Sequence, residues 1–522
     1  MTIEFTLNSV LVSTELLSAS LLDVLRDEQR IESLKAGCAP QGQCGCCTVI
    51  IDGEARVSCV TPVRRLAGKA VTTIEGLPLE VQALWAEAFL GAGASQCGFC
   101  TPGIIARLEV LRSAGELVPE RVNAALSAHL CRCTGWQTIV EASQLVCDGT
   151  VCADSGRDFQ AASRRATIEG GSTQKVGPEW VLGSGSFSDD GCPAGARIAL
   201  RADSGEWHVG ETMVEVRQAA HKVQGRKTTV LAEPPLELPG GTWDRVLRTS
   251  WVEPAYLDTD SSWCLPGGDP SDPSGNGGAF GSKQESIVTT AASDLAQQYQ
   301  QPIRVRLSRE DVVRLGPKRP PIAAGINDDG TGVIRVVDTP GIADAISSVA
   351  PQLKVELVHV DGPPTSARIR AAGWAEAAVL MAATRDRDSR VTEVTAPNGS
   401  QATAEVSDES IAVTVRCGEV LDEVVLRSYC IGAAHMAYGW VTNEGLAVDS
   451  TGEILNLTIR SFGVVRPGVM PPVKVTIIDD SGPAINGSDA VFAAVAGAVW
   501  RSLDYPTSWP CGALPFRGSV SE

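Results

Sequence analysis

The sequence of 522 residues lacks several features that define whole classes of protein. It has no apolar run approaching the roughly 20 residues needed to cross a bilayer. Its opening stretch, MTIEFTLNSV, contains an acidic residue and lacks the basic start of a secretory signal peptide. It also lacks a basic excess: 44 Lys and Arg face 62 Asp and Glu, a net charge of −18, which argues against nucleic-acid binding. We therefore expect a soluble cytoplasmic protein with no membrane span and no nucleic-acid partner.

Some chemical signatures are also missing. The five His residues show no paired spacing of the kind that binds metal, so we interpret each as structural. His435 stands at helical spacing beside Tyr438 and Trp440, which favours a place in the core. The glycine-rich stretch around Gly277 does not complete a dinucleotide fingerprint, because Phe280 stands where the last Gly belongs.

Cysteine, by contrast, is abundant. The chain has 16 Cys, and nine of them fall between Cys38 and Cys133. A secreted disulfide scaffold is normally short, rich in Cys throughout and preceded by a signal peptide. Cysteines clustered in one part of a long chain instead favour metal binding or redox chemistry. The later thiols are expected to be buried and inert, among them Cys264, Cys430 and Cys511.

Two patterns of secondary structure follow one another in the amino-terminal region. Strand-like segments predict β-hairpins around Asn8-Ser9 and Asp52-Gly53, with strands at 3–7, 10–14, 48–51 and 55–60. Between them, residues 21–29 predict a helix. Residues 80–146 then predict several helices. Thr101-Pro102 is expected to cap and start one of them, and Thr134 to cap another.

The first cysteine group has the spacing Cys38-x5-Cys44-x2-Cys47-x11-Cys59. Three of these thiols lie on one tight loop and the fourth on the next strand, so together they can surround a two-iron cluster. Glycines in the loop let the backbone wrap closely and point N–H groups at sulfur. The plant-type ferredoxin spacing has four residues between the first two ligands, whereas this loop has five. Cys46 is an extra thiol that could compete with Cys47, although the x2 spacing from Cys44 favours Cys47.

The second cysteine group is Cys97-x2-Cys100, followed 30 residues later by Cys131-x-Cys133. Cys100 and Cys133 each precede an expected helix cap, and a helix N-terminus stabilises an anionic cluster. Structural zinc is the alternative. Zinc ribbons, however, prefer two C-x2-C pairs at shorter separation, whereas the second pair here is C-x-C. The spacing favours iron–sulfur clusters and leaves zinc, or a set of buried thiols, as the alternative.

The segments GCAPQGQCGCCTVIIDG and QCGFCTPGII…HLCRCTGWQTIVEA resemble the two [2Fe–2S] domains of the molybdenum hydroxylases, the xanthine dehydrogenase and aldehyde oxidase family, over residues 1–146. The resemblance implies one cluster near the flavin, held by Cys38, Cys44, Cys47 and Cys59. It implies a second cluster near the molybdopterin, held by Cys97, Cys100, Cys131 and Cys133. Gln96 corresponds to a Gln that touches the pterin, and Trp136 stands where relatives often have Tyr.

Residues 158–505 resemble the molybdopterin-binding region of that family in a weakened form. The loop GGAFGSK (277–283) is similar to a glycine-rich loop that lies against the molybdenum centre. This implies cofactor contacts from Gly278, Phe280 and Gly281. A packed or interface loop is the alternative, and the one that the residues themselves favour. Residues 301–321 resemble the strand and helix after this loop, with three basic side chains expected on a solvated or partner-facing strand, Arg304, Arg306 and Arg309.

Two departures from the family bear on activity. The region is short, since a strand–helix unit before the glycine-rich loop and an insertion after Arg370 are both missing. Relatives also carry a Gly-Glu pair before the last buried helix, and that Glu activates the molybdenum hydroxyl. Here the match is Gly487-Ser488, and a serine hydroxyl cannot serve as a carboxylate base. Asp489 is one position away and is expected to point elsewhere. No catalytic residue is therefore predicted.

These observations predict an α+β multidomain protein. A plant-type ferredoxin β-grasp domain is expected at 1–76, and a helical [2Fe–2S] domain at 77–147. A linker at 148–175 is expected to lead to a shortened, mixed α/β molybdopterin-domain-like lobe at 176–522. The linker carries no flavin-domain signature, so FAD is expected on another chain.

Three functional hypotheses follow. The first is an electron-transfer subunit with two [2Fe–2S] clusters and a non-catalytic lobe. It would relay electrons from the molybdopterin of a catalytic partner chain to an external FAD-binding subunit. The second is a compact hydroxylase that binds molybdopterin itself, with Asp489 or Glu376 as its base. The third is a non-enzymatic redox sensor or scaffold.

Overall fold

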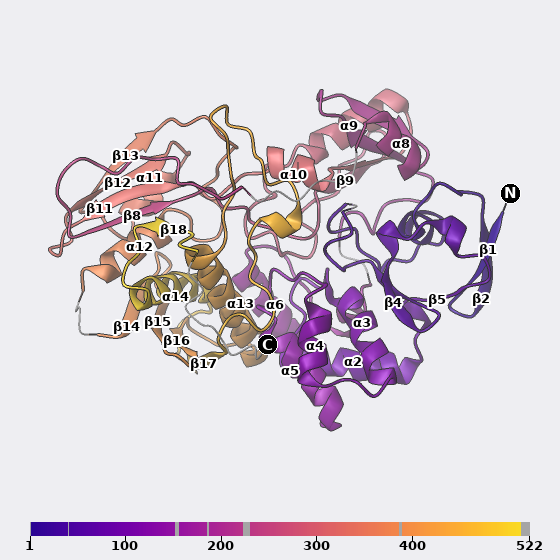
Figure 1. The fold of residues 1–522 in the computed structure, drawn as a ribbon, viewed down its shortest axis with the longest axis horizontal. Helices are drawn as coiled ribbons and strands as arrows, with labels where there is room; N and C mark the ends of the chain where they lie inside the picture. Colours follow the sequence, from indigo (N-terminus) through magenta and orange to yellow (C-terminus); the bar gives the residue numbers. More distant parts are fainter. Residues whose placement is uncertain are drawn as a thin grey trace.

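A computed structural model describes residues 2–39, 41–151, 156–184, 187–222, 230–385 and 389–512. Residues 152–155 of the predicted linker and 513–522 of the predicted lobe lie outside the described residues. Within the described ranges the chain forms four β-sheets and the helices between them. Figure 1 shows the amino-terminal strands at one end, a group of helices beside them, and the larger part of the chain at the other end. The mixed α/β, multidomain character predicted from the sequence is confirmed.

The first sheet has the strand order β2-β1-β5-β3-β4. Its strands are β1 Ile3–Leu7, β2 Val10–Thr14, β3 Thr48–Ile51, β4 Glu54–Val57 and β5 Ala70–Thr72. Both predicted hairpins are confirmed: β1 pairs antiparallel with β2, and β3 with β4. Asn8 and Ser9 adopt positive φ angles of 48° and 69°, which match the right-handed twist of the flanking strands.

The predicted helix at 21–29 forms, but most of it is wound more widely than an α-helix. Helix α1 covers Leu21–Asp23, and the following turn, Val24–Glu28, is a π-helix. Ser20 and Asp23 form a reciprocal capping box at the start. Leu21, Leu22 and Leu25 are buried as the pattern predicted.

The next region is helical, as expected. It contains α2 Leu79–Ala92, α3 Thr101–Ser113, α4 Pro119–Leu126 and α5 Gln137–Asp148. The predicted caps are displaced. Cys100, rather than Thr101, is the N-cap of α3, and Trp136, with a φ of 71°, is the N-cap of α5. The prediction for Thr134 is wrong because its hydroxyl lies 3.1 Å from the sulfur of Cys131 and does not cap the helix.

The segment expected to be a linker contains a packed helix, α6 Phe159–Gly170. Asp158 caps its start by accepting from the N–H groups of Gln160 and Ala161. Arg165 and Glu169, which suggested exposure in the sequence, are fully enclosed and form an ion pair of 2.8 Å. Part of the predicted linker is therefore a core element, because the charges of its helix neutralise each other.

Three further sheets follow, with the orders β7-β6-β10-β9, β13-β12-β11-β8-β18 and β14-β15-β16-β17. Their strands are β6 Arg197–Arg201, β7 Trp207–Gly210, β8 Arg245–Thr249, β9 Ser261–Cys264, β10 Ile303–Arg306, β11 Ile322–Ile326, β12 Gly332–Val337, β13 Leu353–Val358, β14 Val391–Thr395, β15 Gln401–Val406, β16 Ile411–Arg416, β17 Val473–Ile478 and β18 Ser508–Trp509. The helices are α7 Pro178–Val181, α8 Met213–Ala219, α9 Val288–Tyr299, α10 Arg309–Leu315, α11 Ile342–Ser347, α12 Trp374–Ala383, α13 Glu423–Thr442 and α14 Ser488–Ser502.

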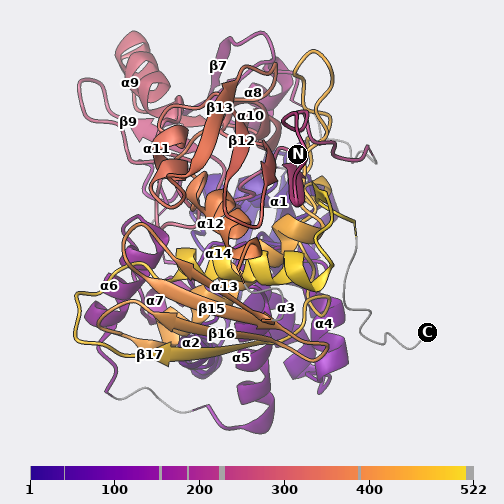
Figure 2. The same ribbon diagram turned by 90° about the vertical axis from the view of Figure 1, so that its left-hand side faces the viewer.

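Helix α14 is the centre of the larger part of the chain. Figure 2 shows it running between the sheet that contains β11–β13 and the sheet that contains β15–β17. Its residues from Ala490 to Trp500 are buried on every side, which confirms the buried helix predicted from AVFAAVAGAVW. Among the described residues, none of the helices is long and apolar enough to cross a membrane.

Two of the three strand predictions in this part are correct. The hairpin predicted at 402–415 is formed by β15 and β16, and PVKVTIIDD contains β17. The strand expected from ILNLTIRSF is wrong, because that stretch contains only a short 3-10 turn at Ile459–Ser461. Its polar groups turn instead to the amino-terminal region, where Arg460 donates to the carbonyls of Gln43 and Ser127.

The three arginines of the 301–321 segment are not solvated, contrary to prediction. Arg304, Arg306 and Arg309 are 5%, 7% and 0% exposed. Arg304 forms a 2.9 Å ion pair with Asp27, and Arg309 donates to the carbonyl of Gly37 at 2.6 Å. These side chains join β10 and α10 to the amino-terminal region, a contact that an alternating strand pattern does not reveal.

We predict that the buried ion pair between Arg157 and Asp422 is essential for docking α13 onto the amino-terminal region. Their side chains are 8% and 7% exposed. Arg157→Ala leaves Asp422 as an unpaired buried charge and should lower the free energy of unfolding by about 3–5 kcal/mol. The matched control is Arg427→Ala, which breaks the half-exposed pair with Glu141 and should cost about 1 kcal/mol or less. Urea denaturation measures both, and equal losses would contradict the prediction.

Candidate metal centres

The first cysteine set is assembled from two segments. Cys38, Cys44 and Cys47 lie on the loop before β3, and Cys59 follows β4. All four side chains are buried. Cys44 and Cys59 donate S–H groups to Cys38, which holds the pKa of Cys38 well below its ordinary value. Cys59 likewise lowers the pKa of Cys47. The chain thus brings together the four thiols that the sequence grouped.

Backbone geometry around this set agrees with the glycine-rich loop expected from the sequence. The N–H groups of Gln41 and Gln43 lie 3.2 and 3.5 Å from the sulfur of Cys38. Gly45 has a φ of 77°, and a Cβ at this position would collide with the ring of His129. Burial lowers the pKa of His129 to about 3, so this imidazole is neutral.

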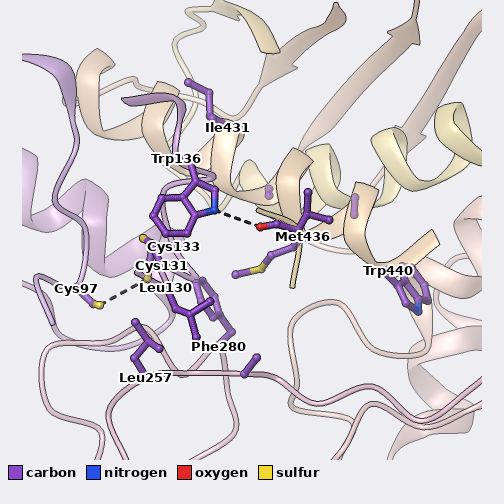
Figure 3. Close-up of a cluster of buried hydrophobic side chains, with 14 of the residues drawn as sticks. Cys97, Leu130, Cys131, Cys133, Trp136, Leu257, Phe280, Ile431, Met436 and Trp440 are labelled. Atoms are coloured by element: carbon purple, nitrogen blue, oxygen red, sulfur yellow. Dashed lines mark hydrogen bonds between the residues drawn. The ribbon is translucent and has the colours of Figure 1, made fainter. Parts of the chain in front are cut away.

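The second cysteine set joins the starts of two helices. Cys97 and Cys100 precede α3, and Cys131 and Cys133 precede α5. The sulfur atoms of Cys97 and Cys133 are 3.5 Å apart. Cys100 pairs with Cys131 and lowers the pKa of that thiol to about 6. Figure 3 shows three of these sulfurs beside Leu130, Leu257 and Phe280.

Each set therefore consists of two thiol pairs. A tetrahedral zinc ion with bonds of about 2.3 Å would draw all four sulfurs to mutual distances of about 3.8 Å. Among the described residues, no three His, Cys, Asp or Glu side chains converge closely enough for one metal ion. Two separate pairs are instead what a dinuclear cluster requires, with one pair for each iron. The donor sets fit [2Fe–2S] clusters better than zinc.

The two sets are in direct backbone contact. The N–H of Leu130, next to Cys131, donates to the carbonyl of Cys44 at 2.9 Å. A Cβ on Gly103, in the first turn of α3, would lie 2.9 Å from the carbonyl of Cys46. The loop of the first set therefore rests on the helix that follows the second.

Two predicted cofactor residues border the second set. Gln96 donates to the carbonyl of Cys133 at 3.1 Å and to the hydroxyl of Ser428 at 3.0 Å. Gly278 has a φ of 82°, and a Cβ there would lie 3.0 Å from the sulfur of Cys97. The glycine-rich loop thus packs directly on these thiols.

The other two predicted residues turn away from the cysteines toward Arg370. Phe280 adopts a φ of 48°, and its ring lies 5.0 Å from the guanidinium of Arg370. Gly281 leaves no space for a Cβ because the carbonyl of Arg368 lies against it. These contacts show the loop packed against protein on both sides.

Ser488 lies at the start of α14 and is fully buried. Its hydroxyl accepts from Arg370, whose Nε donates to Asp489 at 2.7 Å. Its N–H donates to the carboxylate of Glu169 at 2.8 Å. The sequence analysis missed Glu169 and its partner Arg165. The signal was an Arg and a Glu four residues apart inside the segment interpreted as a linker.

The space around this part of the chain is small. A cavity bordered by Arg132, Phe280, Arg370 and Trp440 measures about 40 Å³. A second one, between the cysteines of the second set and Gly278, measures about 10 Å³. Pockets for organic ligands are usually roughly 300 Å³ or larger. These cavities hold little more than single water molecules.

Comparison with known proteins identifies the amino-terminal region. Residues 73–144 match the family model described as a [2Fe-2S] binding domain. The nicotine 6-hydroxylase small subunit of Paenarthrobacter nicotinovorans is 43% identical over 124 residues, covering 24% of this chain and 74% of that subunit. The xanthine dehydrogenase iron-sulfur-binding subunit of Escherichia coli O157:H7 is 38% identical over 157 residues, covering 28% of this chain and 95% of that subunit.

The fold of the whole chain is similar to a solved structure. Aldehyde oxidoreductase from Desulfovibrio gigas aligns with a TM-score of 0.71, covering 96% of this chain and 97% of that one. The sequence identity is 12%, so the likeness extends to the fold alone. The larger part of this chain therefore shares an architecture with an oxidoreductase while its sequence has diverged widely.

His435 provides a pH test of the core around the second set. Its Nε2 lies 3.1 Å from the carbonyl of Val465, and burial lowers the pKa of His435 to about 4. The unfolded chain, with a pKa of about 6.5, therefore binds a proton that the folded chain does not. Stability from the neutral ring is complete above about pH 6.5 and falls as the pH drops toward 4, by about 3 kcal/mol at most.

We predict that His435→Gln reduces the loss of melting temperature between pH 7 and pH 5. His359→Gln, at a side chain that is 90% exposed, is the control and should leave the loss unchanged. A pH profile for His435→Gln that coincides with the wild type would show that this ring does not contribute.

Proposed function

Because this chain belongs to the xanthine dehydrogenase and aldehyde oxidoreductase family of [2Fe–2S] iron–sulfur proteins, we propose that it carries electrons between redox partners through two clusters. The observation that carries the proposal is the assembly of eight buried thiols into two sets of two pairs. The first set would hold one cluster through Cys38, Cys44, Cys47 and Cys59. The second set would hold the other through Cys97, Cys100, Cys131 and Cys133.

The chemistry that such clusters supply when bound is one-electron transfer. The chain's own residues prepare the surroundings. The N–H groups of Gln41 and Gln43 direct positive dipoles at the first set. The second set is enclosed by the glycine-rich loop and by α13, which keeps water away from its sulfurs. The contact between Leu130 and Cys44 holds the two sets at a fixed separation.

We propose further that the larger lobe is a non-catalytic scaffold. Ser488 stands where the resemblance places the catalytic Glu, and a hydroxyl paired with Arg370 cannot take a proton at neutral pH. Asp489 is occupied by the same guanidinium. Glu376 accepts from Arg319 at 2.8 and 2.9 Å and from the N–H of Gly373, so its oxygens are also engaged.

The residues around the glycine-rich loop do not fit a molybdopterin. Gly278 is packed on the cysteines beside which the pterin was expected, and the cavities there measure about 10 and 40 Å³. Gln96 keeps an unpartnered Oε1, but its amide N–H groups are already used within the protein. We derive no catalytic step through this cofactor in the chain.

The proposal assigns molybdopterin and FAD to partner chains. Relatives of the amino-terminal region are named as subunits, which supports an assembly with other chains. We propose a molybdopterin-binding catalytic subunit as electron donor and an FAD-binding subunit as acceptor. The scaffold lobe would provide the docking surface for one of them.

A compact hydroxylase is the second candidate function. The fold similarity to aldehyde oxidoreductase over nearly the whole chain favours it. It would require the glycine-rich loop to move off the second cysteine set and Asp489 to leave Arg370. Metal content distinguishes the two candidates.

We predict about four irons per chain and no molybdenum in the purified protein. Cys38→Ser and Cys97→Ser should each remove about two irons, because each cluster loses one ligand. Cys264→Ser is the control: this buried thiol points at the carbonyls of Leu265 and Gly268, and its loss should leave the iron content unchanged.

Elemental analysis of the chain, alone and with its co-expressed partners, provides the measurement. Molybdenum near one atom per isolated chain would favour the compact hydroxylase and direct attention to Asp489→Asn. Zinc in place of iron would exclude both candidate functions.

A further inference from the structure

Cys46 belongs to neither cysteine set, yet it is fully buried beside both. It occupies the loop of the first set, between Gly45 and Cys47. The structure decides which of the two adjacent thiols completes that set. Cys47 pairs with Cys59, whereas Cys46 turns to Cys44. Cys46 is therefore a ninth thiol in this region, and its role is distinct from ligation.

The sulfur of Cys46 lies on the side of the first set that faces the second. It is 3.8 Å from the carbonyl of Cys44 and within hydrogen-bonding reach of the Cys44 sulfur. On its other side it interacts electrostatically with Cys100 and Cys131. Its thiol thus stands between sulfurs of the two sets.

The backbone on both sides of Cys46 keeps this position rigid. The N–H of Lys35 donates to the Cys46 carbonyl at 3.3 Å. Gly103 approaches the same carbonyl so closely that a Cβ would lie 2.9 Å away. Gly45 cannot accept a side chain because His129 covers it. Rotation of the side chain is therefore the only adjustment open to the thiol, and a cavity-filling methyl group would satisfy packing without it.

A thiol differs from a methyl group in this place by one hydrogen-bond donor. Once Cys44 is a thiolate ligand it can only accept, and an S–H group is a weak donor that suits a sulfur acceptor. A hydrogen bond to a ligand sulfur stabilises the reduced cluster more than the oxidised one, because reduction adds negative charge to the sulfurs. Such a bond raises the reduction potential.

We propose that Cys46 is a positioning residue that donates a hydrogen bond to Cys44 and raises the reduction potential of the first cluster relative to the second. This inference rests on the proposed two-cluster function and adds a direction to it. A higher potential at the first cluster favours electron flow from the second set toward the first.

The test is a potentiometric titration of the anaerobically purified full chain, followed by electron paramagnetic resonance. In Cys46→Ala the midpoint potential of the first cluster should fall while that of the second is unchanged. In Cys46→Ser, which retains a donor, it should return toward the wild-type value. The signal of the first cluster is identified as the one that Cys59→Ser alters.

Cys264→Ala is the matched control, since it removes a buried thiol that donates to carbonyls far along the chain from both sets. Iron content should stay at about four per chain in all three variants. An unchanged first midpoint in Cys46→Ala would overturn the inference. So would a loss of iron in Cys46→Ala, because Cys46 would then be a ligand. Absence of iron from the wild type would instead refute the proposed function itself.

Discussion

The hydrogen bond from the N–H of Leu130 to the carbonyl of Cys44 is the contact on which the arrangement depends. It joins the loop of one cysteine set to the segment that carries half of the other. Eight thiols can be buried here only because glycines allow the two segments to approach at backbone distance, as Gly45 and Gly103 do. The two sets therefore form one structural unit even though their cysteines are far apart in sequence.

The larger lobe encloses this unit with buried charges. Arg132, between two cysteines of the second set, forms a bidentate pair with Glu444, and Arg309 reaches the carbonyl next to Cys38. Each such pair is costly to break, because a single remaining partner would be a buried charge. Similar pairs fill the positions where a compact hydroxylase would need a free base. Enclosure of the cysteines and loss of a catalytic carboxylate thus have a common structural basis.

Local features could be predicted from the sequence, and contacts between distant segments could not. The cysteine sets, both hairpins of the first sheet and the buried helix α14 follow from spacing and periodicity. The burial of Arg304 could not be predicted, because it depends on Asp27, which is 277 residues away. Helix α6 was missed since Arg165 and Glu169 look exposed until they are paired. Thr134 failed as a cap because a cysteine sulfur takes its hydroxyl.

The central claim is that this one chain holds two separate one-electron centres. A reductive titration of the isolated chain, monitored by electron paramagnetic resonance with spin quantitation, tests it most directly. The account predicts uptake of about two electrons per chain and two distinguishable signals of equal intensity. Uptake of a single electron with one signal, or no reducible iron–sulfur signal, would contradict it.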